Sequence, residues 1–400
     1  MAIVTGGHFL SHFYIMTFPP LFPLLVPVFD LTNTQLGLIM SAVALGTFLQ
    51  VPAGALVRRI GAKRVLVLGL SLTGLSIVLV GLAPSYPALL LFALLSGIGQ
   101  SAFHPADYAL LDAANAGRDA GKSFGVHTFG GFVGFAAAPA VVGTIGFLAG
   151  WRTAAIAVGA VGILAALVMV VTLDTVFLKR MDELDRGTRP TSFSAVFAGL
   201  FSPGIAALFA FFLALVLAGK GLQTFSGVLV VSFFGLPEAT GNTALTVLFS
   251  LVAVGVLVGG VLADRYDPRR ILVVAMGTAA ALVLVTAAGS AVQGRNAVVA
   301  FFALLGLLYG IPLPARDRLV ADFSAADAVG VNFGIVFTGG SIGSLLSPAL
   351  LGAALDTGNP GLAFALIGVF FAAAGGIVVA VGRGLVTGDV GEPPRVPDRS

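Results

Sequence analysis

The chain has no cysteine and few charged residues. The missing cysteine excludes disulfide bonds and thiolate metal sites, but it names no compartment. Asp, Glu, Lys and Arg make up 10% of the 400 residues, against about 25% in ordinary soluble domains, while 58% are hydrophobic. The mean hydropathy is +1.05. A soluble fold must cover its surface with polar groups, so this composition indicates an integral membrane protein.

A cleavable amino-terminal signal is not visible either, because the first apolar stretch has no basic region before it and no small-residue cleavage site. The sequence pI near 9.4 would fit a nucleic-acid partner. The basic residues, however, form short clusters between apolar stretches. Their placement fits orientation in a membrane better, and we expect no nucleic-acid partner.

Twelve apolar stretches are long enough to cross a bilayer, which takes about 20 residues as a helix. Backbone exposed to lipid must bond to itself, and the alternation of a membrane barrel is missing, so we expect an all-α protein. The first six spans are expected at 3–29, 34–57, 63–82, 87–113, 119–146 and 152–173. The second six are expected at 203–234, 239–262, 271–290, 297–321, 329–354 and 361–382.

The densest charged run, "LKRMDELDRGTRPTS", divides the chain almost in half. We therefore expect a six-helix bundle at 1–174, a cytoplasmic linker at 175–200, a second bundle at 201–383 and a disordered polar tail at 384–400. Most Lys and Arg residues fall in the loops on one side of the expected topology. The positive-inside rule places that side, with both termini and the linker, in the cytoplasm.

The two halves are internal repeats. A shift of 209 residues aligns Gly97 with Gly306, Pro105 with Pro314 and several glycines after them without a gap. "GALVRRIGAKRVL" and "GVLADRYDPRRIL" also join corresponding spans in each half. The chain is therefore expected to form two pseudo-symmetric six-helix bundles related by an axis along the membrane normal.

Two such halves, a long central loop and the "GVLADRYDPRR" motif resemble the major facilitator superfamily (MFS) over about residues 3–382. The gate and loop motif falls on Gly54, Arg58, Arg59, Gly61, Gly260, Asp264, Arg265, Arg269 and Arg270. The first copy departs from the family pattern, because Arg58 stands where the family usually has Asp. "GIGQSAFHP" and "GKSFGVHTFGGFVG" resemble, more narrowly, the branch containing fosmidomycin-resistance exporters.

The resemblance implies a secondary transporter of the cell membrane that moves a small solute by alternating access, often coupled to protons. Drug or organic-anion efflux and uptake of an organic acid or metabolite both remain open. We expect a monomer in the bilayer, with no cofactor and no metal.

Polar residues inside the spans are candidates for the substrate or proton pathway. All four histidines lie in the first half: His8 and His12, four apart on one helix face, His104 and His127. Each could instead be a hydrogen-bonded packing residue. Histidine, with an ordinary pKa of about 6.5, exchanges protons readily.

Lys220 lies deep in a second-half span, where a cation costs about 2.5–3.5 kcal/mol unless it finds a partner or water. We expect it to face the cavity, as a binding cation for an anionic group or the partner of a carboxylate, rather than to reach the interface. Gln223 follows within one turn and adds a polar contact.

Asp107 is the carboxylate well inside a first-half span. The repeat places it opposite Arg316, so one hypothesis pairs these two across the inner gate when the transporter faces outward. Pairing with Arg118 is an equal alternative, and Asp317 is expected to be solvated or locally paired. Pro105 and Pro314 are expected to bend equivalent helices.

Two rival interpretations fit the residues poorly. "AGRDAGKS" at 116–123 lacks the first glycine of a phosphate-binding loop and follows no strand. His8, His12, His104 and Asp107 could form the metal site of a membrane enzyme, but the interval "FLS" lacks the Glu of H-E-x-x-H. We therefore expect no enzyme.

Overall fold

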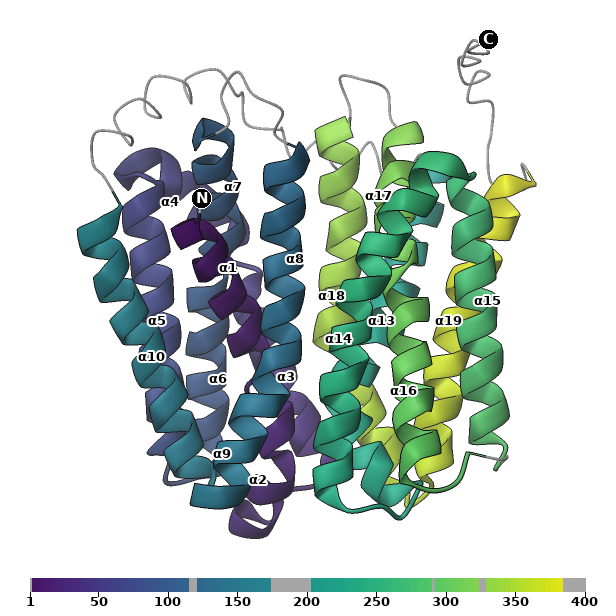
Figure 1. Ribbon diagram of the computed structural model, residues 1–400, viewed down its shortest axis with the longest axis horizontal. Coiled ribbons are helices and arrows are strands. Elements are labelled where there is room, and N and C mark those ends of the chain that lie inside the picture. Colours follow the sequence, from purple (N-terminus) through teal and green to yellow (C-terminus); the bar gives the residue numbers. More distant parts are fainter. Residues whose placement is uncertain (1, 115–120, 174–202, 290–291, 324–328, 384–400) are drawn as a thin grey trace.

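The computed structural model describes residues 2–114, 121–173, 203–289, 292–323 and 329–383. The expected linker at 175–200 and the expected tail at 384–400 lie outside these residues. Within the described part, eleven helices are long and apolar enough to cross a membrane, or twelve if one bent pair is a single span. They stand side by side in two groups, one formed by α1–α10 and the other by α13–α19 (Figure 1). The prediction of an all-α membrane protein is confirmed.

The first group contains six spans, several of them in pieces. Its helices are α1 (Ala2–Ile15), the short 3-10 turn η1 (Pro19–Leu21), α2 (Phe22–Phe29), α3 (Asn33–Thr47), α4 (Gln50–Ile60), α5 (Ala62–Gly81), α6 (Tyr86–Gln100), α7 (Phe103–Ala114), α8 (Gly121–Ala138), the π-helical turn η2 (Pro139–Gly143), α9 (Thr144–Ala149) and α10 (Trp151–Thr172).

The second group has longer, less interrupted helices. They are α13 (Pro203–Ser232), α14 (Glu238–Arg265), α15 (Pro268–Ala287), α16 (Arg295–Gly310), α17 (Pro312–Asp322), α18 (Val329–Asp356) and α19 (Pro360–Gly382). The start of α1 and the end of α19 lie at the same end of the bundle (Figure 1).

Four of the helix breaks come four or five residues before a proline. Proline lacks the N–H that would bond to the carbonyl four residues earlier, and its ring clashes with that carbonyl. The prolines concerned are Pro19 after α1, Pro52 after α3, Pro105 after α6 and Pro314 after α16. The break before Pro52 bends α3 against α4 by 40°. The break before Pro105 separates α7, which carries two candidate site residues, from α6.

The two halves meet most closely where α3 begins and α18 ends. A Cβ on Gly37 would lie 2.1 Å from the Pro348 carbonyl oxygen, so only glycine allows the helices to approach this far. Ser41 Oγ donates to the Leu345 carbonyl at 2.6 Å. These contacts close the end of the bundle opposite the start of α1 (Figure 1).

Candidate functional site

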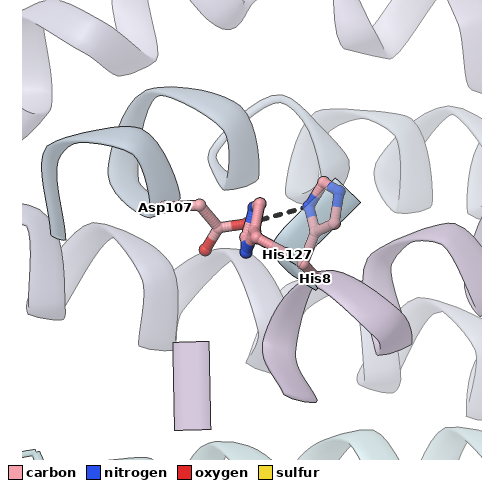
Figure 2. Close-up of side chains that lie close together, drawn as sticks. All are labelled: His8, Asp107 and His127. Carbon is pink, nitrogen blue, oxygen red and sulfur yellow. Dashed lines mark hydrogen bonds and ion pairs between the residues drawn. The ribbon is translucent and has the colours of Figure 1, made fainter. Parts of the chain in front are cut away.

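Three side chains from three helices converge inside the first half. Nδ1 of His8 on α1 lies 3.2 Å from Oδ2 of Asp107 on α7. Nε2 of His127 on α8 lies 3.7 Å from the same oxygen. Figure 2 shows the two imidazoles beside the carboxylate. His8 is 2% exposed, and the other two are fully buried. We call these three residues the His-Asp cluster.

The remaining two histidines surround this cluster. The rings of His8 and His127 stack with their centroids 3.9 Å apart. The His12 ring lies 4.4 Å from that of His8, and the His104 ring lies 5.4 Å from it. The structure therefore brings all four histidines and Asp107 together. His8 and His12 share one face of α1, and His104 and Asp107 share one face of α7, because the members of each pair lie about one helical turn apart.

Several polar atoms at this site are buried without a hydrogen-bond partner. They are Nδ1 of His12, Nδ1 of His104, Oδ1 of Asp107 and both ring nitrogens of His127. Most buried polar groups in proteins are hydrogen-bonded, because an unpaired one costs about 1–3 kcal/mol. These atoms are thus available to a proton, water or ligand.

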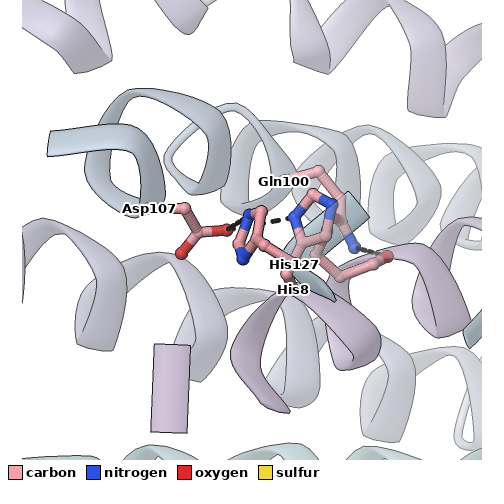
Figure 3. A network of polar contacts seen from close by, with 5 residues as sticks. His8, Gln100, Asp107 and His127 are labelled. Carbon is pink, nitrogen blue, oxygen red and sulfur yellow. Dashed lines mark hydrogen bonds and ion pairs between the residues drawn. The ribbon is translucent and has the colours of Figure 1, made fainter. Parts of the chain in front are cut away.

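Two further residues fix the positions of the rings. Gln100 on α6 donates from Nε2 to the Ser11 carbonyl on α1 at 3.0 Å, as Figure 3 shows beside the cluster. A Cβ on Gly131 of α8 would lie 2.8 Å from His8 and 2.9 Å from His12. Neither Gln100 nor Gly131 is among the site residues expected from the sequence. A glutamine inside an apolar helix was the one available signal.

The His-Asp cluster also meets the distance requirement for a metal ion. Its three candidate ligand atoms all lie within 4.8 Å of one another, and imidazole with carboxylate suits zinc. This set differs from the metal set considered from the sequence, because His127 takes part while His12 and His104 do not.

Lys220 on α13 is part-buried and engages a neutral group. Its Nζ donates to Oε1 of Gln223 at 2.6 Å, and Nε2 of Gln223 donates to Sδ of Met16 in the other half at 3.1 Å. Among the described residues, no carboxylate lies within 4.0 Å of Lys220. The predicted contact with Gln223 is present, whereas a carboxylate partner is not.

Arg316 on α17 pairs with its neighbour rather than with Asp107. Its Nε donates to Oδ1 of Asp317 at 2.9 Å, and its guanidinium lies 5.0 Å from the Phe212 ring. Asp317 is thus locally paired. Asp107 has histidine neighbours instead, and Arg118 lies outside the described residues. The Asp107–Arg316 hypothesis concerns the outward-facing state and stays a prediction, which a charge-swapped double variant would test.

The gate and loop motif lies at the ends of α4, α14 and α15. Gly61 follows α4 with a φ of +87°, which favours glycine. Arg269 lies in the first turn of α15, and its backbone N–H donates to Oδ1 of Asp267, the residue that caps this helix, at 2.7 Å. Its guanidinium lies 5.3 Å from the Phe323 ring. The remaining charged motif residues are exposed: Arg58, Arg59, Asp264, Arg265 and Arg270. Gly54 and Gly260 lie within α4 and α14.

Two known proteins with similar sequences are named for multidrug resistance and for anion transport. The chain is 24% identical over 361 residues to "Multidrug resistance protein 2" of Bacillus subtilis (strain 168), covering 88% of each protein. It is 31% identical over 121 residues to "Probable anion transporter 3, chloroplastic" of Arabidopsis thaliana, which covers 29% of this chain and 23% of that protein.

Solved structures share the fold. A bacterial homolog of the human lysosomal transporter Spinster has a TM-score of 0.77 at 17% identity, with 96% of both chains covered. The nucleoside transporter NupG has a TM-score of 0.77 at 13% identity, with 96% of this chain and all of that one covered.

The family model named Major Facilitator Superfamily matches residues 4–244 and 221–398. These two matches together span nearly the whole chain. With two six-span groups and a buried polar cluster between helices, the chain belongs to the Major Facilitator Superfamily and is a membrane transporter rather than an enzyme.

Proposed function

We propose that this transporter exports a small solute across the cytoplasmic membrane by alternating access, driven by protons that enter through the His-Asp cluster. The observation that carries the proposal is the contact between His8 Nδ1 and Asp107 Oδ2 at 3.2 Å, with both groups buried. Groups that exchange protons are rare inside apolar helices, and their usual role in transporters is proton relay.

The cluster can hold a proton in more than one place. A proton between His8 and Asp107 can sit on either group, and the second imidazole, His127, lies 3.7 Å from the same carboxylate oxygen. Loss of the proton leaves a buried charge, which is costly in an apolar surrounding. The protonated and deprotonated states of the cluster therefore differ in free energy. This difference can favour one orientation of the halves over the other.

The contacts between the halves support an alternating-access cycle. The contacts between α3 and α18 lie at the end where α3 begins and α18 ends, and the basic loops lie at the other end. The positive-inside rule assigns the basic end to the cytoplasm. On that assignment, this structure is closed on the outside and both termini are cytoplasmic.

Export is favoured over uptake by one relative. The bacterial protein named for multidrug resistance aligns over 88% of both chains. Because removing a drug from the cell is one way to resist it, we assign export here: solute leaves as protons enter. Uptake of a metabolite remains the outcome that the transport assay would reveal if this assignment is wrong.

The test uses purified protein in liposomes with EDTA present, so that bound metal plays no part. A panel of organic acids, amino acids, sugars and antibiotics is first screened by thermal shift. For each solute that binds, transport is measured with and without a pH gradient. We expect the gradient to drive wild-type transport, with the solute moving against the proton flow.

Asp107→Asn should abolish the proton-driven component while exchange of solute down its own gradient persists. Asp30→Asn is the matched control. Asp30 is exposed at the end of α2 with a φ of 51°, a conformation that asparagine tolerates. Proton-driven transport by Asp107→Asn at the wild-type rate would contradict the proposal.

A further inference from the structure

The boundary between the two halves carries a positive charge that the described residues do not balance. Lys220 donates to the neutral Gln223, and no described carboxylate lies within 4.0 Å of it. Asp107, a buried carboxylate of the first half, is engaged by His8. An ammonium taken from water without a counter-charge is costly, so an anion from outside would stabilise this position.

Lys220 is part-buried and faces the other half. One turn further along α13, Gln223 contacts Met16 at the break after α1. Lys220 also lies close enough to His12 of α1 to interact electrostatically with it. The lysine therefore projects toward the boundary between the two halves.

Further donors lie within one turn of the lysine. Thr224 is 2% exposed, and its Oγ1 has no hydrogen-bond partner. A buried hydroxyl without a partner in the protein can donate to a bound solute. Together with the amide of Gln223, α13 offers one cation and two neutral polar groups, the pattern expected for an oxyanion with several acceptor oxygens.

An aromatic surface lies on the first-half side of this boundary. The Phe135 ring on α8 lies 4.3 Å from that of His12 and 5.3 Å from that of Phe249 on α14, which belongs to the other half. Phe132 also lies edge-on to His12 at 6.3 Å. Small-molecule sites commonly combine such apolar walls with a few polar groups.

From these contacts we infer that Lys220, Gln223 and Thr224 form the subsite for the anionic head of the solute, an organic anion whose apolar or aromatic body packs on Phe135 and Phe249. The inference rests on the proposed transport function and names its substrate class. The first half then holds the proton groups, and α13 of the second half recognises the charge.

The experiment compares pairs of ligands that share a body and differ in charge. Aromatic carboxylate, phosphonate and sulfonate probes are each paired with the neutral amide or ester. Indole-3-acetate with indole-3-acetamide is one such pair. Affinities are measured on purified protein in detergent without any gradient, so failure of proton coupling would not affect the result.

Wild-type protein should bind at least one anion more tightly than its neutral partner. Lys220→Gln should lower the affinity for that anion by about 10–100-fold, because a hydrogen bond to a charged group is lost. Its affinity for the neutral partner should stay within about twofold of the wild-type value. Lys220→Arg should restore part of the preference. Lys63→Gln is the control, since Lys63 binds the backbone carbonyls of Val170 and Leu173 in α10 and at its end.

Two results would overturn the inference: no preference for any anion in the wild type, or an anion preference that survives Lys220→Gln in a monodisperse protein. Because Asp107→Asn leaves this subsite intact, it should keep the anion preference while losing proton drive. The two proposals can therefore fail separately.

Discussion

Asp356, the last residue of α18, holds Thr34, in the first turn of α3, through two hydrogen bonds to one carboxylate oxygen. The Thr34 N–H donates at 2.8 Å and its hydroxyl at 2.6 Å. The other oxygen accepts from the N–H and the side chain of Asn33 at 2.8 and 3.0 Å. A carboxylate from one half thus caps a helix of the other, where the helix dipole favours a negative charge.

Asp356→Asn should loosen this closed end. The amide keeps one acceptor oxygen but turns a donor toward the donors of Thr34 or Asn33. Because the site is exposed, we expect a cost on the order of 1 kcal/mol, or about a fivefold change in the ratio of open to closed forms. Since the chain has no cysteine, Ser41→Cys can report opening through its rate of labelling with an impermeant maleimide.

Asp267→Asn is the control for that measurement. Asp267 also caps a helix, accepting from the Arg269 N–H at 2.7 Å, but both groups belong to the second half. The labelling of Ser41→Cys should be the same with and without this change. Equal labelling in the Asp356→Asn background would show that the cap does not hold the two halves together.

Gly37→Ala should force α3 and α18 apart. Its new Cβ would lie 2.1 Å from the Pro348 carbonyl oxygen, and backbone cannot move aside as a flexible side chain can. The overpacking cost is about 1–3 kcal/mol, which predicts a lower melting temperature and an outer end that opens more often. Gly277→Ala on α15 is the comparison. Nothing lies within 4 Å of its new Cβ, so its melting temperature should equal or exceed that of the wild type.

Gly131→Ala should disturb the His-Asp cluster without removing a titratable group. The methyl would lie within 3.0 Å of both His8 and His12, so the rings must shift. We expect proton-driven transport to fall by about tenfold or more, while solute exchange without a gradient falls less. Gly125→Ala, on the same helix with nothing within 4 Å of its Cβ, should leave the ratio of these two rates unchanged.

Pro105→Ala should restore an N–H to the turn between α6 and α7 and straighten it. His104 and Asp107 lie on α7, so their placement against His8 on α1 would change. Pro314→Ala makes the same change at the equivalent point of the second half, whose helices carry no residue of the His-Asp cluster. The ratio of proton-driven transport to exchange should drop in Pro105→Ala and change little in Pro314→Ala. An equal drop in both would mean that the bend matters for motion rather than for placing Asp107.

Much of the fold could be predicted from the sequence, because each span is a local property. The length of each apolar stretch predicts a helix. A proline follows each of four helix breaks, at Pro19, Pro52, Pro105 and Pro314. The expectation of bent helices rested on Pro105 and Pro314 alone. The same rule applied to Pro52 would have predicted the break between α3 and α4.

The contacts of the site were harder to predict. The sequence places four histidines on helices of one half, but the rotation of α1, α7 and α8 about their axes depends on packing, such as the close passage at Gly131. For Asp107 the repeat offered Arg316 and proximity offered Arg118, whereas the structure places His8 beside it. Asp356 and Asn33, 323 residues apart, carry no local signal of their contact.

The separation of His8, Asp107 and His127 from Lys220 has a consequence for how such proteins diversify. The three residues of the His-Asp cluster belong to the amino-terminal half, and Lys220 belongs to the other, with Gln223 and Met16 in contact across the boundary. Substitutions on α13 can therefore change which solute is transported while the proton-coupling residues stay the same. A hybrid that joins this amino-terminal half to a relative's carboxy-terminal half is the natural way to exploit that modularity.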